Sequence, residues 1–307
     1  MPRQLAAQGD APSDAPTVRR PRVGLVLGSG GIKCTAAVGL WKVLVREGIQ
    51  VDVAVGCSGG SIYAAGIAMQ WDVRWAEERT LHMWKDLFTR FHYRSVLRAM
   101  LPRLFGFSER VGLVDDRRIG AVMEGAYADH TFADTRIPLF LAATDLRTGE
   151  KVVLAEGRIA DAVRASIALP VLLRPWPVQG RLLIDGGASN PLPIDVAIRE
   201  RCDVIIAMGF ETALSEHMPS LPTLARQATA IATNNLLWST FAFYSAVHHA
   251  EIVPVMPTFD RRIPLADASL IPYLIDQGER AAEAELPYLR RLLAAVPSSS
   301  PSAGDGR

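Results

Sequence analysis

The sequence predicts an α/β fold that begins with a parallel βαβ unit. The apolar run 22–27 indicates a buried strand, and a glycine loop with a helical pattern over 35–47 follows it. A second strand is expected at 51–55, which is rich in β-branched residues. Since a βαβ crossover is right-handed and joins parallel strands, the glycine turns after both strands should meet at the same carboxyl edge of the sheet.

The composition indicates one globular domain. A chain of 307 residues, 49% of them hydrophobic, can bury a substantial core, and no linker divides it, so a single domain is expected over 21–295. A net charge of +1, from 33 basic and 32 acidic residues, argues against nucleic-acid binding. Cys34, Cys57 and Cys202 are odd in number and lack CxxC spacing, so we expect free thiols, no zinc or other cofactor, and a reducing compartment.

Both ends of the chain and two uncharged stretches bear on membrane insertion. Residues 1–20 lack the apolar core of a secretory signal and are expected to form a disordered arm, as 296–307 should form a disordered tail. The stretches 53–71 and 227–250 contain no Asp, Glu, Lys or Arg. A glycine turn interrupts the first and several polar residues interrupt the second, so both are expected to be internal parts of a cytoplasmic protein.

The second predicted strand ends in a Gly-x-Ser-x-Gly turn formed by Gly56, Ser58 and Gly60. A strand before this turn and a helical segment after it, at 62–69, are typical of a nucleophile elbow, in which strained backbone raises the serine hydroxyl above the sheet. A Cβ at either flanking glycine would clash across the turn. The alternative is a glycine-rich βα loop without chemistry, and the pattern alone leaves both open.

A helical insertion is expected over 71–123, after the elbow helix. Its part 81–107 combines aromatic residues with Lys85 and four arginines against a single acid, Asp86. Such a segment can lie on anionic lipid as an interfacial helix or lid, which predicts peripheral membrane contact. Aromatic residues at helical spacing are more often core, which favours an insertion that packs on the domain.

Further strands and helices alternate along the rest of the chain. Strands at 138–144 and 151–154 flank a turn and predict a hairpin. The strand 181–184 runs directly into Asp185, which opens a run of turn-forming residues. Helices are predicted over 159–168, 221–247 and 272–293, and strands over 203–208 and 251–255.

Ser58 can act as a nucleophile only with a base and with donors for the oxyanion that forms on a carbonyl. The loop 28–31 offers open backbone N–H groups at a helix N-terminus, and the N–H of Gly59 follows the serine directly. Nucleotide binding is disfavoured, because Lys33 stands where a dinucleotide fingerprint needs its third glycine and no P-loop motif is present.

Two kinds of base are compatible with the sequence. Most serine hydrolases use a histidine in the order Ser, acid, His, and only His248 and His249 follow both Ser58 and a plausible acid. A histidine pair at a helix end is more often a solvated cap. Asp185 lies at a strand end beside glycines, with Asn190 near enough to orient it, although an Asx turn explains the same pattern equally well.

Three motifs resemble, in this order, those of the patatin-like phospholipases in their bacterial form: Gly30-Gly31-Ile32-Lys33, Gly56-Cys57-Ser58-Gly59-Gly60 and Asp185-Gly186-Gly187. The segments 143–149, 165–170 and 190–193 are also similar, and the resemblance spans about 22–257. It implies a three-layer sandwich with a mainly parallel central sheet and a helical insertion. It also implies lipid acyl ester hydrolysis by a dyad of Ser58 and Asp185 without histidine, with Gly30, Gly31 and Ile32 as oxyanion loop on the same carboxyl edge of one parallel sheet.

The first motif departs from the family's pattern at two positions. Lys33 stands where arginine is usual, so an ammonium replaces a planar guanidinium. Cys34 stands where glycine is usual, which alters the geometry of the loop. Cys57, at the variable position of the elbow, should point away from the substrate. Burial is expected to raise the pKa of Asp185, since a carboxylate with a pKa of about 3.9 is a weak base. The alternative function is a non-catalytic, lipid-sensing or regulatory module.

Overall fold

The computed structural model describes residues 19–87, 112–114, 116–265 and 267–294. The expected tail, nearly all of the expected arm and positions 88–107 of the basic aromatic segment lie outside these ranges. Arg19 and Arg20, which the sequence placed in the arm, form ion pairs with Asp203 (2.9 Å) and Asp52 (2.5 Å). These two residues are therefore attached to the domain by ion pairs.

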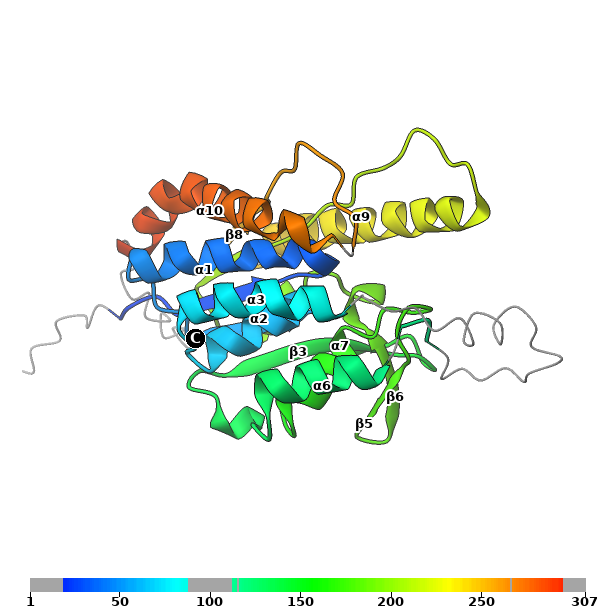
Figure 1. The fold of residues 1–307 in the computed structure, drawn as a ribbon. Helices are drawn as coiled ribbons and strands as arrows, with labels where there is room; N and C mark the ends of the chain where they lie inside the picture. The colour runs from blue at the N-terminus through cyan, green and yellow to red at the C-terminus, as the bar shows by residue number, and fades with distance from the viewer. Residues whose placement is uncertain (1–18, 88–111, 115, 266, 295–307) are drawn as a thin grey trace, which may run out of the picture.

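A mixed, mainly parallel sheet forms the centre of the molecule (Figure 1). Among the described residues its strands are β1 (Val23–Leu27), β2 (Val53–Cys57), β3 (Leu139–Asp145), β4 (Lys151–Leu154), β5 (Trp176–Val178), β6 (Arg181–Asp185), β7 (Val204–Met208) and β8 (Glu251–Val255). Their order is β5-β6-β3-β2-β1-β7-β8, and β4 also pairs with β3. The strands β1, β2, β3, β7 and β8 are parallel, whereas β4 and β6 run antiparallel to β3.

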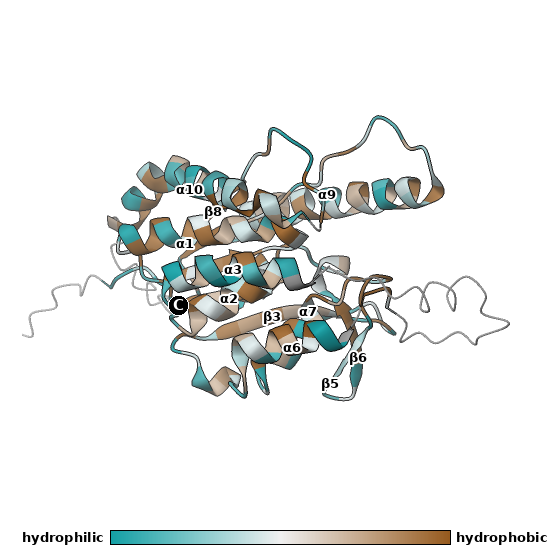
Figure 2. Cartoon of the chain, in the orientation of Figure 1, coloured by the Kyte–Doolittle hydropathy of each residue, from teal (hydrophilic) through white to brown (hydrophobic). Residues whose placement is uncertain are grey.

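Helices cover both faces of the sheet, which gives three layers and confirms the expected fold class (Figures 1 and 2). They are α1 (Ala36–Arg46), α2 (Gly59–Ala68), α3 (Val73–Leu87), α6 (Asp116–Tyr127), α7 (Ile159–Ser166), α8 (Ile194–Arg199), α9 (Leu221–Val247) and α10 (Ile271–Ala294). Alternate strand residues face opposite ways. Leu25 and Leu27 of β1 pack in the core with α1, α2 and α10, whereas Val26 packs in a second core with α8 and α9.

Two element boundaries near the glycine turns differ from the sequence-based prediction. β2 begins at Val53, because Asp52 is a turn residue whose carboxylate accepts the Val23 N–H (2.7 Å). The helix expected from 62 begins at Gly59, directly after Ser58. Glycine has low helix propensity, which conceals this first turn in the sequence.

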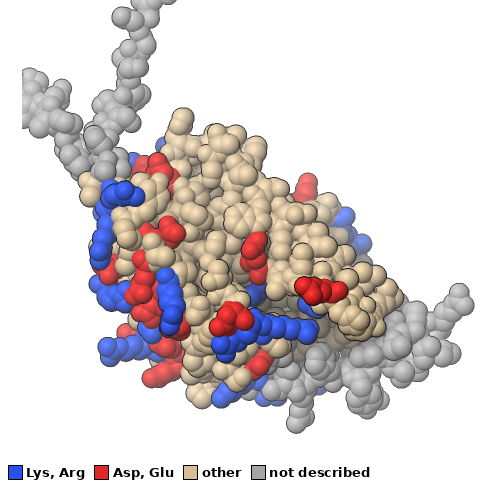
Figure 3. Space-filling view, turned by 90° about the horizontal axis from the view of Figure 1, so that it is seen from above, with Lys and Arg blue, Asp and Glu red and all other residues tan. Residues whose placement is uncertain are grey.

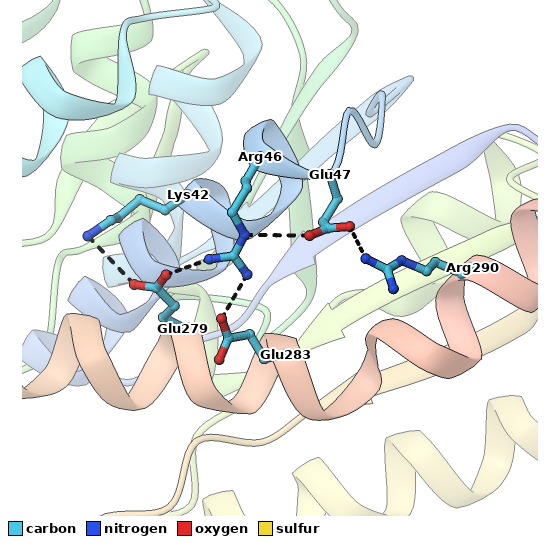
Figure 4. Close-up of polar contacts among 6 residues, drawn as sticks. All are labelled: Lys42, Arg46, Glu47, Glu279, Glu283 and Arg290. Atoms are coloured by element: carbon cyan, nitrogen blue, oxygen red, sulfur yellow. Dashed lines mark hydrogen bonds and ion pairs between the residues drawn. The ribbon is translucent and has the colours of Figure 1, made fainter.

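The helices α1 and α10 cross at a contact between glycines. A Cβ at Gly39 would lie 2.1 Å from the Ile275 carbonyl oxygen, and a Cβ at Gly278 would lie 1.9 Å from the Ala36 carbonyl oxygen. No side chain fits there without moving a backbone. Figure 4 shows the ion pairs beside this contact, which join Lys42, Arg46, Glu47, Glu279, Glu283 and Arg290.

The helix α9 lies on the surface, which corrects the expectation that 227–250 is internal. Only Ala230, Leu237, Thr240 and Phe241 of this helix are buried. Many large apolar side chains of α9 and the loop before it are exposed, namely Leu214, Met218, Leu221, Leu224, Ile231, Trp238, Phe243 and Val247. Seen from above, charged side chains gather at one side of the molecule and much of the remaining face is uncharged (Figure 3). No helix in the described ranges is long and apolar enough to cross a membrane.

Candidate active site

Ser58 and Asp185 come together on either side of one strand. Cys57 of β2 pairs with Ala142 of β3, so Ser58 follows at the level of Ala143. On the other side of β3, Asp185 pairs with Ala143 directly. Register therefore brings the hydroxyl and the carboxylate to the same level of the sheet.

Asp185 reaches this edge on an antiparallel strand, which corrects the expectation of one parallel sheet for the whole site. β5 and β6 form a hairpin whose turn holds Gln179 and Gly180 at positive φ (50° and 75°). Such a turn reverses the chain tightly. The β6 strand is thereby directed back toward the elbow, and its last residue is the carboxylate.

Ser58 has the strained backbone of a nucleophile elbow, with φ 54° and ψ −131°. Its carbonyl oxygen accepts the Ser61 N–H (2.9 Å) and the Ser61 hydroxyl (2.6 Å), which tie the turn to α2. A Cβ at Gly60 would lie 2.3 Å from the Leu27 carbonyl oxygen, and one at Gly56 would lie 2.5 Å from the Ser61 Cα. The flanking glycines are therefore required by the close approach of backbone.

The two side chains form a buried, directly bonded pair. Ser58 Oγ donates to Asp185 Oδ2 at 2.5 Å, and the two residues are 7% and 4% exposed. The other carboxylate oxygen accepts the Gly187 N–H at 2.7 Å. Burial raises the pKa of Asp185 to about 6, while the hydrogen bonds from Ser58 and Gly187 oppose that rise. A carboxylate with this pKa is a stronger base than one in water.

The glycine loop after β1 packs directly against the elbow. A Cβ at Gly59 would lie 2.6 Å from the Gly31 carbonyl oxygen, so the loop and the start of α2 are in contact. Gly31 has a φ of +57°, which favours glycine. Within the described structure, the N–H groups of Gly30, Gly31, Ile32 and Gly59 donate to no protein acceptor. They are the available donors for an oxyanion beside Ser58.

Ser166 is a site residue that sequence reasoning missed. Its hydroxyl accepts the Ser58 N–H (2.9 Å) and donates to the Ala142 carbonyl oxygen (2.7 Å). It thus fixes the backbone of the nucleophile from the C-terminal end of α7. The sequence offered one signal for it: the segment 165–170 resembles the family's pattern, although this resemblance gave no role to Ser166.

Asn190 does not orient Asp185, contrary to the expectation from sequence. Its amide donates to Asp195 Oδ1 (3.1 Å), and its side-chain oxygen accepts the Leu192 N–H (3.2 Å). The Asp185 carboxylate is oriented instead by Gly187, two residues away. Asn190 therefore shapes the loop that follows the carboxylate.

Cys57 and Gly186 pack behind the pair. The Cys57 thiol donates to the Asn190 carbonyl oxygen at 3.4 Å, which turns it away from the Ser58 hydroxyl. Burial raises its pKa far above the ordinary value, so it stays a neutral thiol. A Cβ at Gly186 would lie 2.4 Å from the Ala142 carbonyl oxygen, so this position accepts only glycine without a shift of the strand.

The histidine candidates lie at the opposite edge of the sheet. His248 and His249 follow α9 and precede β8, whose first residue Glu251 pairs with the first residue of β7, Val204. Ser58, by contrast, follows the last residue of a parallel strand. No histidine in the described ranges hydrogen-bonds Ser58 or Asp185. Of the candidate bases in the described ranges, Asp185 is the one that hydrogen-bonds the Ser58 hydroxyl.

Lys33 and Cys34, the two departures from the family pattern, are both accommodated by the structure. Lys33 Nζ donates to the Glu211 carbonyl oxygen at 2.7 Å, and burial lowers its pKa to about 8 against the attraction of Cys34 and Glu211. The buried Cys34 thiol donates to the Gly28 carbonyl oxygen at 3.3 Å. A Cβ at Gly59 would lie 2.9 Å from the Cys34 sulfur, so this thiol fills the space between loop and elbow.

The described residues show no cluster of His, Cys, Asp or Glu that could hold a metal ion.

The chain is similar to a known protein family and to proteins of that family. Residues 25–198 match the family described as Patatin-like phospholipase. An uncharacterized NTE family protein of Mycobacterium tuberculosis is 30% identical over 228 residues, which cover 73% of this chain and 58% of that protein.

Two further similarities are to a longer protein and to a solved structure. Patatin-like phospholipase domain-containing protein 6 of Homo sapiens is 31% identical over 206 residues, 65% of this chain and 14% of that protein. Human GIVD cytosolic phospholipase A2 superimposes with a TM-score of 0.47 at 13% identity, over 89% of this chain and 60% of that chain. The chain thus spans little more than half of its mycobacterial relative and a small part of the human protein.

Proposed function

The chain belongs to the patatin-like phospholipase family, and from this premise we propose that it is a serine acyl hydrolase of lipid esters, of the phospholipase A, lysophospholipase or esterase type. The observation that carries the proposal is the hydrogen bond of 2.5 Å from Ser58 Oγ to Asp185 Oδ2. Family membership supports the substrate class, and the buried dyad beside unpaired loop amides supports acyl transfer.

The reaction proceeds in two halves. Ser58 Oγ attacks the ester carbonyl carbon while its proton passes to Asp185 Oδ2, and the loop amides stabilise the oxyanion. The intermediate collapses, the C–O bond to the alcohol breaks, and Asp185 returns the proton to the leaving oxygen. Water then loses a proton to Asp185 and attacks the acyl carbon. The bond from that carbon to Ser58 Oγ breaks, Asp185 returns the proton to Oγ, and the fatty acid is released.

Substitution of the dyad tests this proposal. We expect Ser58→Ala and Asp185→Asn each to lower the hydrolysis of a p-nitrophenyl acyl ester by about a thousandfold or more, whereas His248→Ala and His249→Ala should hydrolyse it at the wild-type rate. The histidine variants are matched controls, because they remove the only alternative base that the sequence offered. A loss at either histidine as severe as that at Asp185 would replace the dyad with a triad.

A fluorophosphonate probe separates an enzyme from a non-catalytic, lipid-sensing module. The probe phosphonylates an activated serine, so wild-type protein should be labelled and Ser58→Ala should not. Asp185→Asn should be labelled more slowly, because the base is lost. Wild-type protein that stays unlabelled would favour the regulatory function.

Peripheral membrane contact through 81–107 is part of the proposal. Replacement of Arg90, Arg94 and Arg98 with glutamine should weaken co-sedimentation with anionic liposomes, since each basic residue near an anionic surface contributes about 1 kcal/mol. Arg226→Gln is the matched control, because Arg226 is exposed on α9, outside this segment. Unchanged sedimentation of the triple variant would leave the segment with a packing role alone.

A further inference from the structure

The loop between β7 and α9 lies directly against the oxyanion loop. A Cβ at Gly30 would lie 2.7 Å from the ring of Phe210, which is 3% exposed. Next to it, Lys33 Nζ donates to the Glu211 carbonyl oxygen at 2.7 Å and lies 3.4 Å from Thr212 Oγ1. Lys33, which directly follows Ile32 of the oxyanion loop, is therefore hydrogen-bonded to a loop from another part of the chain.

This second loop is in turn fastened to α9 by Asn234. The Thr212 N–H donates to Asn234 Oδ1 at 2.9 Å, and Asn234 Nδ2 donates to the Thr212 carbonyl oxygen at 2.9 Å. The side-chain amide thus holds both backbone groups of one residue. The Trp238 indole N–H, one turn further along α9, donates to the Glu211 carboxylate.

We propose that Asn234 is a positioning residue for the oxyanion loop, acting through the backbone of Glu211 and Thr212 on Lys33. The inference rests on the proposed function for its effect on turnover. Asn234 touches neither the dyad nor the loop amides, so its role is to fix the acceptor that keeps the Lys33 side chain, and with it Gly30–Ile32, in place.

The charge of Lys33 explains why the acceptor matters. Lys33 is half-buried, and an ammonium that has lost part of its water needs hydrogen-bond acceptors. Lys33 Nζ donates to the Glu211 carbonyl oxygen and to the Thr212 hydroxyl, and the charged or titratable groups that act on it are Cys34 and Glu211. Without the two hydrogen bonds of Asn234, the Glu211 carbonyl oxygen is no longer held against Lys33 Nζ, so the ammonium loses its acceptor and the oxyanion loop loses this attachment.

The neighbouring Asn235 provides a matched control. Asn234 is half-buried against the loop, whereas Asn235 is exposed and its side chain makes no hydrogen bond within the described structure. Both are asparagines in the middle of the same helix, so alanine changes helix propensity equally at the two positions. Only Asn234→Ala removes the two hydrogen bonds to the Thr212 backbone.

Turnover of a soluble p-nitrophenyl ester is the first readout. We expect Asn234→Ala to lower kcat about tenfold with KM within about twofold, since the misplaced donors stabilise the transition state rather than the bound substrate. Asn234→Asp keeps the acceptor for the Thr212 N–H and loses the donor, so its kcat should be intermediate. Asn235→Ala should match the wild type. Equal kcat for Asn234→Ala and Asn235→Ala would overturn the inference while leaving the proposed function intact.

The titration of Lys33 is a second readout that does not depend on activity. The chain contains only four lysines, Lys33, Lys42, Lys85 and Lys151, so NMR of lysine labelled with 13C at Cε can follow each, with Lys33→Arg to assign the signal. Lys33 should titrate near pH 8 in the wild type and in Asn235→Ala, and at lower pH in Asn234→Ala, because its charged form has lost its acceptor. An unchanged Lys33 titration in folded Asn234→Ala, checked by thermal unfolding, would overturn the inference even if the wild type proved inactive.

Discussion

Replacement of Asp185 with asparagine should stabilise the protein at neutral pH while removing its activity. Asp185 is 4% exposed, and burial raises its pKa from 3.8 to about 6 even though Ser58 and Gly187 donate to it. The native protein therefore holds a costly buried charge at pH values above about 6. An amide keeps the shape: its oxygen can accept the Gly187 N–H and its nitrogen can donate to Ser58.

Proton linkage sets the sign and the magnitude of this effect. A carboxyl whose pKa is higher in the native state binds its proton more tightly when folded, so the wild type loses stability as the pH rises from 3.8 to about 6. One pKa unit corresponds to about 1.4 kcal/mol, so this shift costs about 2 kcal/mol at pH 5 and about 3 kcal/mol at pH 7.5. The advantage of Asp185→Asn in unfolding free energy should therefore grow by about 1 kcal/mol across that range.

Urea unfolding of both proteins at several pH values between about 5 and 7.5, followed by tryptophan fluorescence, measures the difference. Ser58→Ala is the control, because it removes activity but keeps the buried carboxylate. Its stability should fall with rising pH as in the wild type, and somewhat more steeply, because the hydrogen bond that lowers the pKa of Asp185 is lost. If the unfolding free energy of Asp185→Asn exceeds that of the wild type by the same amount at every pH, or by less as the pH rises, the argument from the buried charge is refuted.

Three further predictions concern the same structure. The acidic limb of kcat/KM should have its midpoint near pH 6, where Asp185 gains its proton, and a midpoint near pH 4 would contradict the raised pKa. Ser166→Ala should lower kcat roughly tenfold with little change in KM, since the Ser58 N–H loses its acceptor, and an unchanged kcat would remove this role. Gly278→Ala should destabilise the protein by about 1–3 kcal/mol in urea unfolding because its Cβ would meet α1, whereas Gly120→Ala, which meets nothing within 4 Å, should not.

Local sequence patterns predicted most elements and the glycine turns. The helix predicted at 221–247 and the strand predicted at 251–255 have the bounds that the structure shows. The Gly-x-Ser-x-Gly turn was recognisable in part because Gly56 is needed where its backbone approaches Ser61, a requirement that depends on a few adjacent residues. Such features are set within one turn of chain, so periodicity and glycine placement suffice to find them.

Features that depend on contacts between distant segments could not be read in the same way. The sequence does not show that the Ser166 hydroxyl accepts the Ser58 N–H or that the Asn234 side chain bonds the Thr212 backbone, because these partners are brought together only by packing. The exposure of α9 was likewise missed, since an uncharged helix has a similar composition on the surface and in the core.

The sequence by itself determined the residue types of the site and the backbone shape around them: a serine between glycines at a strand end, a glycine loop before a helix, and an aspartate before two glycines. The tertiary structure decided which base lies beside that serine. Asp185 reaches Ser58 because a hairpin turns β6 antiparallel and register sets both residues at the level of Ala143, while His248 and His249 are left at the other edge of the sheet. Strand direction and register arise from pairing across many residues of chain, which no local pattern encodes.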